Sequence, residues 1–501
     1  MGVIYSGRPL KFRTAYRIAG ISPNVTFGVH NNSVQNLRRG LAERVFNVET
    51  QEGLAPPPRP IPGAYHRLEE IRGKIVDQMP WAAPLTVQEF LDSYQGDRRY
   101  KVYAEAADSL EHDPVKRSDA FLTTFVKAEK INFSSKPDPA PRVIQPRTPR
   151  YNLSVGLYLK RMEKEVYKAI ANVYGGDPVV MKGYNAHRTA EVMRAGWESF
   201  DNPVAVGLDA SRFDQHVSAE ALRWEHSVYL SRYSGIHKST LRKLLEWQVD
   251  NKGVGRATDG VVKYRVEGCR MSGDMNTALG NCLLMCALVW TYCKDRGIKH
   301  KLYNNGDDCV VIMESRDLGC FQRGLAEWFV EMGFTMKVES PVRVFEQIEF
   351  CQTHPVFDGA KWVMCRDPRV CLSKDTVSLL PMLQGNTRYA WATAIGQCGM
   401  SLAGGIPVMQ EFYSCLLRVG GGKVMGKHPA LESGFARLAV GMHRRYSTVC
   451  EACRVSFWEA FGILPSEQME YERLLSSITP DLKSPHQGNT LYDQTFSLGA
   501  L

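Results

Sequence analysis

Long hydrophobic runs are missing from this sequence of 501 residues. The longest uncharged stretch, residues 275–293, contains polar residues and a glycine, and its unbroken apolar part covers only residues 282–290. A helix that spans a membrane needs about 20 consecutive apolar residues. We therefore expect a soluble protein without a membrane-spanning helix.

Cysteine is absent from the first 268 residues, and all 13 cysteines follow. An odd number at irregular spacing argues against a disulfide scaffold and for reduced thiols. Cys450 and Cys453 form a CxxC pair, but the second pair of a four-ligand zinc site does not follow. The HExxH, GxSxG and GxxxxGK[ST] signatures are also missing, so the protease, esterase and helicase classes have no motif to support them.

Charge of one sign is only mildly in excess: 62 basic against 53 acidic residues give a net charge of +9. This suits a polyanionic partner without proving one. The basic residues gather in two places, residues 1–60 and residues 127–150. Five prolines between positions 56 and 62 predict a linker or a surface strap, because proline ends helices and central strands.

A short apolar run, residues 204–208, predicts a buried strand with Asp209 at its carboxyl end and Asp214 five residues later. Carboxylates at strand ends often hold ligands in proteins that combine helices and sheets. Taken alone, Asp209 could equally cap the segment that follows it.

Residues 301–312 predict two strands joined by a tight turn, because Asn-Gly is a strong hairpin signal. An ordinary hairpin does not explain the adjacent acids Asp307 and Asp308, since neighbouring carboxylates raise each other's pKa unless a cation neutralises them. With Asp209 as a third carboxylate, the pattern favours a divalent cation. Magnesium is the usual choice for oxygen ligands combined with substrate phosphates.

Between these two segments, Thr277 and Asn281 lie four residues apart and would share one face of a helix. A hydroxyl and an amide side by side can recognise a ribose. The alternative is a core helix with Ser272 near its polar amino end.

Three patterns follow one another along the chain: DxxxxD at 209–214, SGxxxTxxxN at 272–281 and GDD at 306–308. Together they resemble motifs A, B and C of viral RNA-dependent RNA polymerases. Residues 125–130 and 207–216 also resemble the replicases of tombusviruses and related plant positive-strand RNA viruses. The resemblance covers about residues 90 to 375.

The resemblance implies an α+β fold shaped as a right hand, whose palm is a small antiparallel sheet with flanking helices. The implied boundaries are a basic N-terminal extension and proline-rich linker at 1–63, fingers at 64–200, palm at 201–375, thumb at 376–480 and a loose polar tail at 481–501. Part of the fingers, at about 225–268, is interleaved with the palm.

The same resemblance implies roles for single residues. Mg²⁺, or Mn²⁺ as a substitute, would be held by Asp209, Asp307 and Asp308. The 2′-OH of the incoming nucleotide would be recognised by Asp214, Thr277 and Asn281, and a flexible loop with Ser272 and Gly273 would contact template and nucleotide.

Residues 127–150 resemble motif F, a basic loop that five prolines keep from forming a regular helix. Its cations are Lys127, Lys130, Lys136, Arg142 and Arg147, of which Lys127, Lys136 and Arg142 would contact the triphosphate. Residues 333–337 resemble motif D, whose lysine, here Lys337, would protonate pyrophosphate. Residues 348–352 resemble motif E; a plain edge strand is the alternative.

The function implied is RNA-templated RNA synthesis for a positive-strand RNA virus, with single-stranded RNA and ribonucleoside triphosphates as substrates. A catalytically silent RNA-binding scaffold and a reverse transcriptase are the alternatives. The expected setting is the host cytoplasm, in a membrane-associated replication complex with a viral auxiliary replication protein. Membrane attachment would come through a partner or a missing upstream region.

Overall fold

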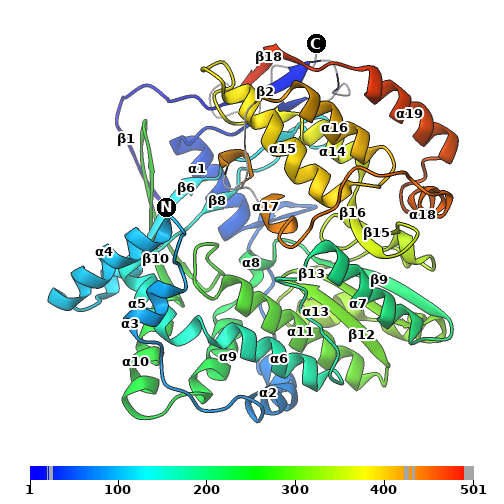
Figure 1. Ribbon diagram of the computed structural model, residues 1–501. Coiled ribbons are helices and arrows are strands. Elements are labelled where there is room, and N and C mark those ends of the chain that lie inside the picture. The colour runs from blue at the N-terminus through cyan, green and yellow to red at the C-terminus, as the bar shows by residue number, and fades with distance from the viewer. Residues whose placement is uncertain (20, 22–25, 422–427, 432–434, 490–501) are drawn as a thin grey trace.

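The computed structural model describes residues 1–19, 21, 26–421, 428–431 and 435–489. Helices and strands are mixed, as expected for an α+β protein (Figure 1). Within the described residues, no helix has both the length and the apolar character needed to cross a membrane.

A four-stranded antiparallel sheet lies at the centre of the fold, in the order β12-β13-β9-β14. Its strands are β9 (Pro203–Ala210), β12 (His300–Asn305), β13 (Asp308–Glu314) and β14 (Met336–Val338). The predicted strand and the predicted hairpin are both confirmed. The hairpin turn consists of Gly306 and Asp307, one residue later than the Asn-Gly signal, and Gly306 has the positive φ (75°) that its first central position favours.

Both faces of this sheet are covered. Alternate residues of β9 point to opposite sides, so that Val204 and Val206 join one core while Ala205 joins another. The first core is built around α11 (Thr277–Asp295), which is buried along most of its length, and the second contains α7 (Ala186–Glu198). Other helices of the first core are α2 (Glu69–Val76), α5 (Pro149–Leu159), α6 (Met162–Val173), α9 (Ala219–Ser231), α10 (Gly235–Glu246) and α13 (Leu325–Glu331).

A five-stranded sheet joins distant parts of the chain in the order β1-β11-β10-β6-β8. The strands are β1 (Gly2–Tyr5), β6 (Leu122–Val126), β8 (Val143–Ile144), β10 (Asp250–Ala257) and β11 (Gly260–Glu267). Helix α1 (Val34–Leu41) packs on this sheet. Strands β10 and β11 thus share a sheet with β6 and β8, which lie more than 100 positions earlier in the chain.

The prediction of an N-terminal extension at 1–63 is wrong, because β1 and α1 are built into this sheet. The proline-rich stretch near its end is a surface strap. The Ile61 N–H donates to the Glu331 carbonyl at 2.9 Å, and Pro60 lies against Gly333.

The C-terminal region is mostly helical, as predicted. Its main helices are α14 (Pro368–Lys374), α15 (Thr387–Ala403), α16 (Met409–Val419), α17 (Phe435–Leu438), α18 (Glu451–Phe461) and α19 (Pro465–Ser477). They share a core with the hairpin of β15 (Thr353–Phe357) and β16 (Trp362–Arg366).

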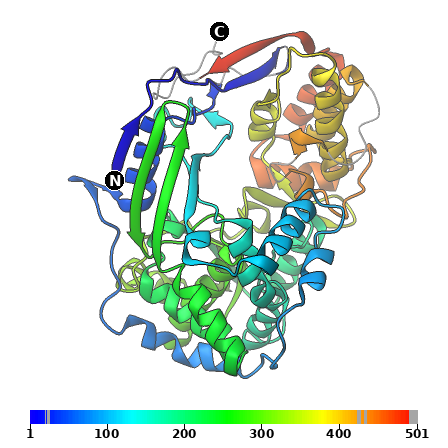
Figure 2. The ribbon, with the colours of Figure 1, turned by 90° about the vertical axis from the view of Figure 1, so that its left-hand side faces the viewer.

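The prediction of a loose tail from residue 481 is wrong for residues 481–489; residues 490–501 lie outside the described residues. Strand β18 (Asp481–Asn489) pairs antiparallel with β2 (Thr14–Ala19), which also pairs with β17 (Val377–Ser378). Figure 2 shows β2 and β18 crossing the top of the molecule, between the β10–β11 hairpin on the left and the C-terminal helices on the right. The two chain ends thus connect the two sides of the fold.

Candidate active site

Three predicted site residues lie side by side across the central sheet. Asp209 is directly opposite Asp308 on β13 and opposite Lys337 on β14. Residues paired in this way point to the same face of a sheet. Asp307 lies in the hairpin turn immediately before Asp308. Strand pairing thus gathers the three predicted carboxylates and the predicted general acid at one edge of the central sheet.

The pKa values of both carboxylates of the hairpin are raised. Burial raises the pKa of Asp308 to about 6, and the charges of Asp307 and Glu339 contribute, although the Cys351 N–H donates to Asp308 Oδ2 at 2.8 Å. Burial and then the charge of Asp209 raise the pKa of Asp307, and the charge of Arg142 offsets this only in part. A cation closer to these carboxylates would lower both pKa values.

The donor set fits a hard divalent cation, which binds carboxylate oxygens and neutralises such repulsion. In the described part of the chain, no three His, Cys, Asp or Glu side chains already converge closely enough to hold an ion. Like charges separate when no cation draws them together. Asp209, Asp307 and Asp308 are therefore the residues that could hold the cation.

A polar cavity of about 140 Å³ adjoins the carboxylates. Its lining includes four arginines, Arg44, Arg142, Arg212 and Arg270, together with Asp214, Ser272 and Asp307. Burial, together with the positive charges of Arg212 and Arg142, lowers the pKa of Arg44 to about 10. Crowded guanidinium groups of this kind suit phosphate groups.

Arg44 and Arg212 were missed by the sequence reasoning. Arg44 follows α1, where only the general basic excess of residues 1–60 indicated a role, and its Nε donates to the Ala140 carbonyl at 2.9 Å. Arg212 follows β9 inside the DxxxxD pattern, has a left-handed backbone (φ 50°) and donates to the Glu43 carbonyl. The two segments are thus tied together beside the cavity.

Asp214 and Asn281 form a direct pair. The Asn281 Nδ2 donates to Asp214 Oδ1 at 2.8 Å, although the two residues are 67 positions apart. Burial raises the pKa of Asp214, and the Asn281 hydrogen bond opposes that rise. The pair joins the beginning of α11 to the segment after β9.

Thr277 is not bonded to that pair. Its hydroxyl donates to the main-chain carbonyls of Met271 (2.7 Å) and Asp274 (3.0 Å), so it holds the loop before α11 in shape. Ser272 Oγ accepts from the Gln145 N–H at 3.3 Å. A side chain at Gly273 would collide with Pro146, so this glycine lets the loop approach the basic loop closely.

The predicted basic cations have different surroundings. Arg142 lines the cavity and pairs with Glu129 (3.3 Å), which also pairs with Lys127 (3.1 Å). Lys136 is exposed, and the cavity lining among the described residues does not include it. The described loop forms no helix before Pro149, as predicted, although it includes the short strand β8. Pro149 starts α5 at the first helical position, where proline is favoured.

Two further cations of this loop are structural. Arg147 is buried and donates to Asp274 Oδ1 at 2.5 Å, and Lys130 donates to the Lys374 carbonyl at 3.1 Å. They connect the basic loop to the loop before α11 and to α14.

Residues 348–352 are not the strand of a hairpin. Cys351 and Gln352 form a tight turn with left-handed φ values (51° and 60°), bridged by Phe350 and Thr353, and the hairpin of β15 and β16 comes after it. This turn brings the Cys351 N–H to Asp308.

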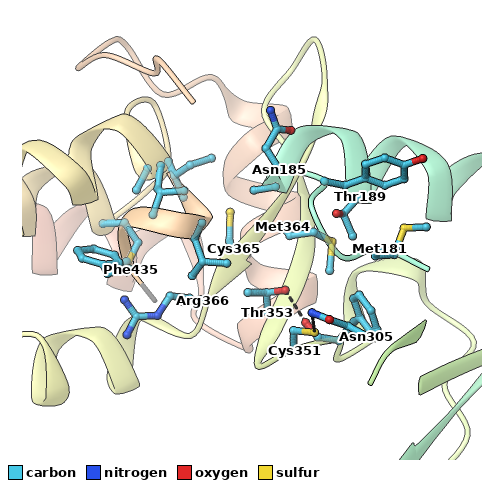
Figure 3. A pocket seen from close by; sticks show the side chains of 18 of the residues that line it. Met181, Asn185, Thr189, Asn305, Cys351, Thr353, Met364, Cys365, Arg366 and Phe435 are labelled. Carbon is cyan, nitrogen blue, oxygen red and sulfur yellow. Dashed lines mark hydrogen bonds between the residues drawn. The ribbon is translucent and has the colours of Figure 1, made fainter. Parts of the chain in front are cut away.

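A second cavity, of about 90 Å³, lies behind this turn. Figure 3 shows its lining of Met181, Met364, Cys365, Phe435 and neighbouring side chains from α7, β16 and α17. Hydrocarbon and sulfur dominate it, whereas the first cavity presents arginines and carboxylates. The chemistry of a charged substrate therefore favours the first cavity.

Comparison with known proteins gives a consistent result. The family described as viral RNA dependent RNA polymerase matches residues 1–483. The RNA-directed RNA polymerase of Melon necrotic spot virus is 47% identical over 487 residues, which cover 96% of this chain and 61% of that protein. The RNA-directed RNA polymerase of Turnip crinkle virus is 47% identical over 484 residues, which cover 95% of this chain and 61% of that protein. The RNA-directed RNA polymerase of Tobacco necrosis virus (strain A) is 48% identical over 477 residues, which cover 94% of this chain and 64% of that protein. The chain thus spans less than two thirds of the length of these relatives.

Proposed function

Because the chain belongs to the viral RNA-dependent RNA polymerase family, we propose that it copies an RNA template into RNA for a positive-strand RNA plant virus. The observation that carries the proposal is the pairing of β9 with β13 and β14, which aligns Lys337, Asp209 and Asp308 beside a cavity lined by four arginines. Negative and positive groups then face a triphosphate from two sides. A nucleotide could place its α-phosphate at the carboxylates and its outer phosphates at the arginines.

The architecture of the proposal is a right hand. The four-stranded sheet and its two cores form the palm, at about residues 201–375. The five-stranded sheet, with the helices of residues 64–200, forms the fingers, to which residues 1–63 also contribute. The C-terminal helices from residue 376 form the thumb.

Asp209, Asp307 and Asp308 hold the divalent cations in this proposal, Mg²⁺ or Mn²⁺ in its place. When bound, such ions stabilise the negative charge on the attacking and leaving oxygens of an in-line phosphoryl transfer. The 3′-OH of the growing RNA gives its proton to water, and its oxygen bonds to the α-phosphorus while the bond to the β-phosphate oxygen breaks. Lys337 gives a proton to the leaving pyrophosphate and regains one from water.

The remaining residues bind and select the nucleotide. Arg142, Arg44 and Arg212 contact the triphosphate, with Lys127 and Lys136 as further contacts from the same loop. Asp214 and Asn281 recognise the 2′-OH, and Thr277 supports them by holding the loop that carries Ser272 and Gly273. A site built to bond a hydroxyl leaves buried polar groups unpaired when that hydroxyl is missing, which disfavours deoxyribonucleotides.

The test is RNA synthesis by the purified chain on a single-stranded RNA template with Mg²⁺. We expect product from ribonucleotides and not from deoxyribonucleotides, and no product from the Asp307→Ala variant. Product from deoxyribonucleotides would indicate a reverse transcriptase. No product, with salt-dependent RNA binding unchanged by Asp307→Ala, would indicate a binding scaffold.

The cellular setting is a further part of the proposal. The chain works in the host cytoplasm, in a membrane-associated replication complex with a viral auxiliary protein, and reaches the membrane through that partner or a missing upstream region. Fractionation of plant cells should find the chain with membranes when the other replication proteins are present, and in the soluble fraction without them.

A further inference from the structure

A buried ion pair lies directly behind the pair of Asp214 and Asn281. The side chains of Glu225, on α9, and Arg270 have no exposed surface. Arg270 Nη1 donates to Glu225 Oε1 at 3.1 Å, and Nη2 donates to Oε2. Glu225 Oε1 also accepts from the Tyr229 hydroxyl (2.7 Å) and Asn276 Nδ2 (2.9 Å). A charge so deeply buried is stable only when it is paired and fully hydrogen-bonded, and Glu225 meets both conditions.

Arg270 contacts both members of the sugar-recognising pair. Its side-chain Nε donates to Asn281 Oδ1 at 2.9 Å, and its main-chain N–H donates to the Asp214 carbonyl at 2.8 Å. The guanidinium fork thus binds Glu225 with two nitrogens while the third binds Asn281. One rigid group is thereby shared between a structural anchor and the substrate-recognising amide.

These partners determine how the amide of Asn281 is oriented. A guanidinium can only donate hydrogen bonds, and an ionised carboxylate can only accept them. Asn281 must therefore turn its oxygen to Arg270 and its nitrogen to Asp214. In the flipped orientation, both contacts would set like groups against each other.

Gly280 makes room for this arrangement. A Cβ at this position would overlap Arg270 Nη2 and Glu225 Oε1. The glycine does not have a left-handed backbone, so close approach of the ion pair to α11 is what requires it. A larger residue immediately before Asn281 would therefore displace the buried ion pair.

We propose that Arg270, anchored by Glu225 and admitted by Gly280, is a positioning residue for ribose selection. It holds the Asn281 amide in the one orientation that pairs with Asp214 and leaves the remaining Nδ2 hydrogen and the other carboxylate oxygen for the 2′-OH. This inference rests on the proposed function. A ribonucleotide uses the oriented pair, whereas a deoxyribonucleotide does not, so loss of the orientation affects ribonucleotides selectively.

The experiment compares ATP with dATP in two assays: kcat/KM for incorporation, and equilibrium binding. Arg270→Lys keeps the charge but loses the fork, and Gly280→Ala leaves every charge in place while displacing the pair. For both variants we expect the ratio of ATP to dATP efficiency to fall about tenfold, mainly through ATP, with dATP changed less than twofold. Thermal melting reports whether each variant is folded.

Arg147→Lys is the matched control. Arg147 also forms a buried pair, with Asp274, and donates to Asn251, but its side-chain hydrogen bonds within the described residues do not reach Asp214 or Asn281. We expect it to lower the melting temperature as Arg270→Lys does, without changing the ATP to dATP ratio. A ratio that follows melting temperature across all variants would overturn the proposal.

A double variant adds a test whose result does not depend on the stability of the protein alone. Because Arg270 acts through the amide of Asn281, Arg270→Lys should reduce the ratio no further when Asn281→Ala is already present. Additive reductions would contradict the proposal, as would an unchanged ratio in folded Arg270→Lys. If Arg270→Lys does not fold, the ATP to dATP ratio of Gly280→Ala, alone and combined with Asn281→Ala, tests the proposal in the same way. A wild-type chain that makes no RNA contradicts the proposed function, and the binding ratio then decides the positioning role.

Discussion

Two charged centres of this protein differ in how their charges are balanced. At the edge of the central sheet, Asp209, Asp307 and Asp308 bring like charges together, and the pKa values of Asp307 and Asp308 are raised. At the buried pair, burial alone would raise the pKa of Glu225, but Arg270 outweighs it and the pKa is lowered. The first centre is left unbalanced and suits a cation; the second is balanced by the protein itself.

The difference shows what each centre contributes. Unbalanced charge costs stability and is useful where a ligand completes it. A buried ion pair that is fully hydrogen-bonded has no donor or acceptor free for a ligand. It fixes the positions of the side chains around it, because each donor and acceptor already has a partner. Substitutions should therefore separate activity from stability at the two centres.

The largest effect should come from Asp307→Asn. Removing one cation-holding carboxylate should reduce RNA synthesis by about 10³-fold or more, equivalent to about 4 kcal/mol of transition-state stabilisation. The melting temperature should stay constant or rise, because repulsion between carboxylates is relieved. Single-turnover synthesis and thermal melting measure the two effects, with Asp201→Asn, at the other end of β9, as the control. A large fall in melting temperature would contradict the comparison.

Glu225→Ala should show the opposite behaviour. It leaves the Arg270 charge buried without its partner, which costs about 3–5 kcal/mol of unfolding free energy. Glu246→Ala is the control, since that carboxylate is largely exposed and its nearest Arg223 nitrogen is 3.9 Å away; about 0.5 kcal/mol or less is expected there. Denaturant unfolding followed by fluorescence measures both, and equal losses would show that Glu225 is not an anchor.

Lys337→Met tests the lysine that lies opposite Asp209 in the central sheet. Loss of a general acid should lower kcat by about 10²-fold with little change in KM. Lys337→His should keep part of the activity with a pH profile shifted to lower pH, because histidine can also donate a proton, whereas Lys337→Arg should behave like the methionine variant. Unchanged kcat in the methionine variant would remove Lys337 from the mechanism.

The smallest effect concerns pH and the buried centre. The pKa of His226, next to Glu225, is lowered to about 4. Burial is the main cause; the charge of Glu225 opposes it and the charge of Arg270 adds to it. The unfolded chain then binds more protons than the folded protein between about pH 6.5 and pH 4, so stability falls as pH is lowered through this window, by roughly 1 kcal/mol per pH unit. His226→Gln should reduce that slope in denaturant unfolding at pH 6.5 and 5.5. An identical slope in both proteins would exclude His226 as its source.

Several elements could be predicted because their signals are local. The apolar run before Asp209 and the turn residues around Gly306 formed the strands they indicated, and antiparallel pairing then placed Asp209 opposite Asp308. Order and spacing of the three motifs carried the family resemblance. The helical character of the C-terminal region was also visible in its pattern.

Other features depend on contacts between distant segments. Nothing near Arg44 shows that it meets Arg142 and Arg212 at one cavity, and nothing near Arg147 shows that it is buried against Asp274. Strand β18 pairs with a strand more than 460 positions earlier, so its polar composition suggested a loose tail. In each case the partner lies outside any local window of sequence.

The sequence by itself determined the family, the carboxylates and the local strands and turns, because residue type and short-range periodicity are enough to specify them. Only the tertiary structure decided that Arg142 lines the cavity while Arg147 is buried against Asp274, because a charged side chain has the same sequence signal in both settings. Arg142 differs from Arg147, and Glu225 from Asp307, in exposure to water and in the charged partner that the fold places beside it.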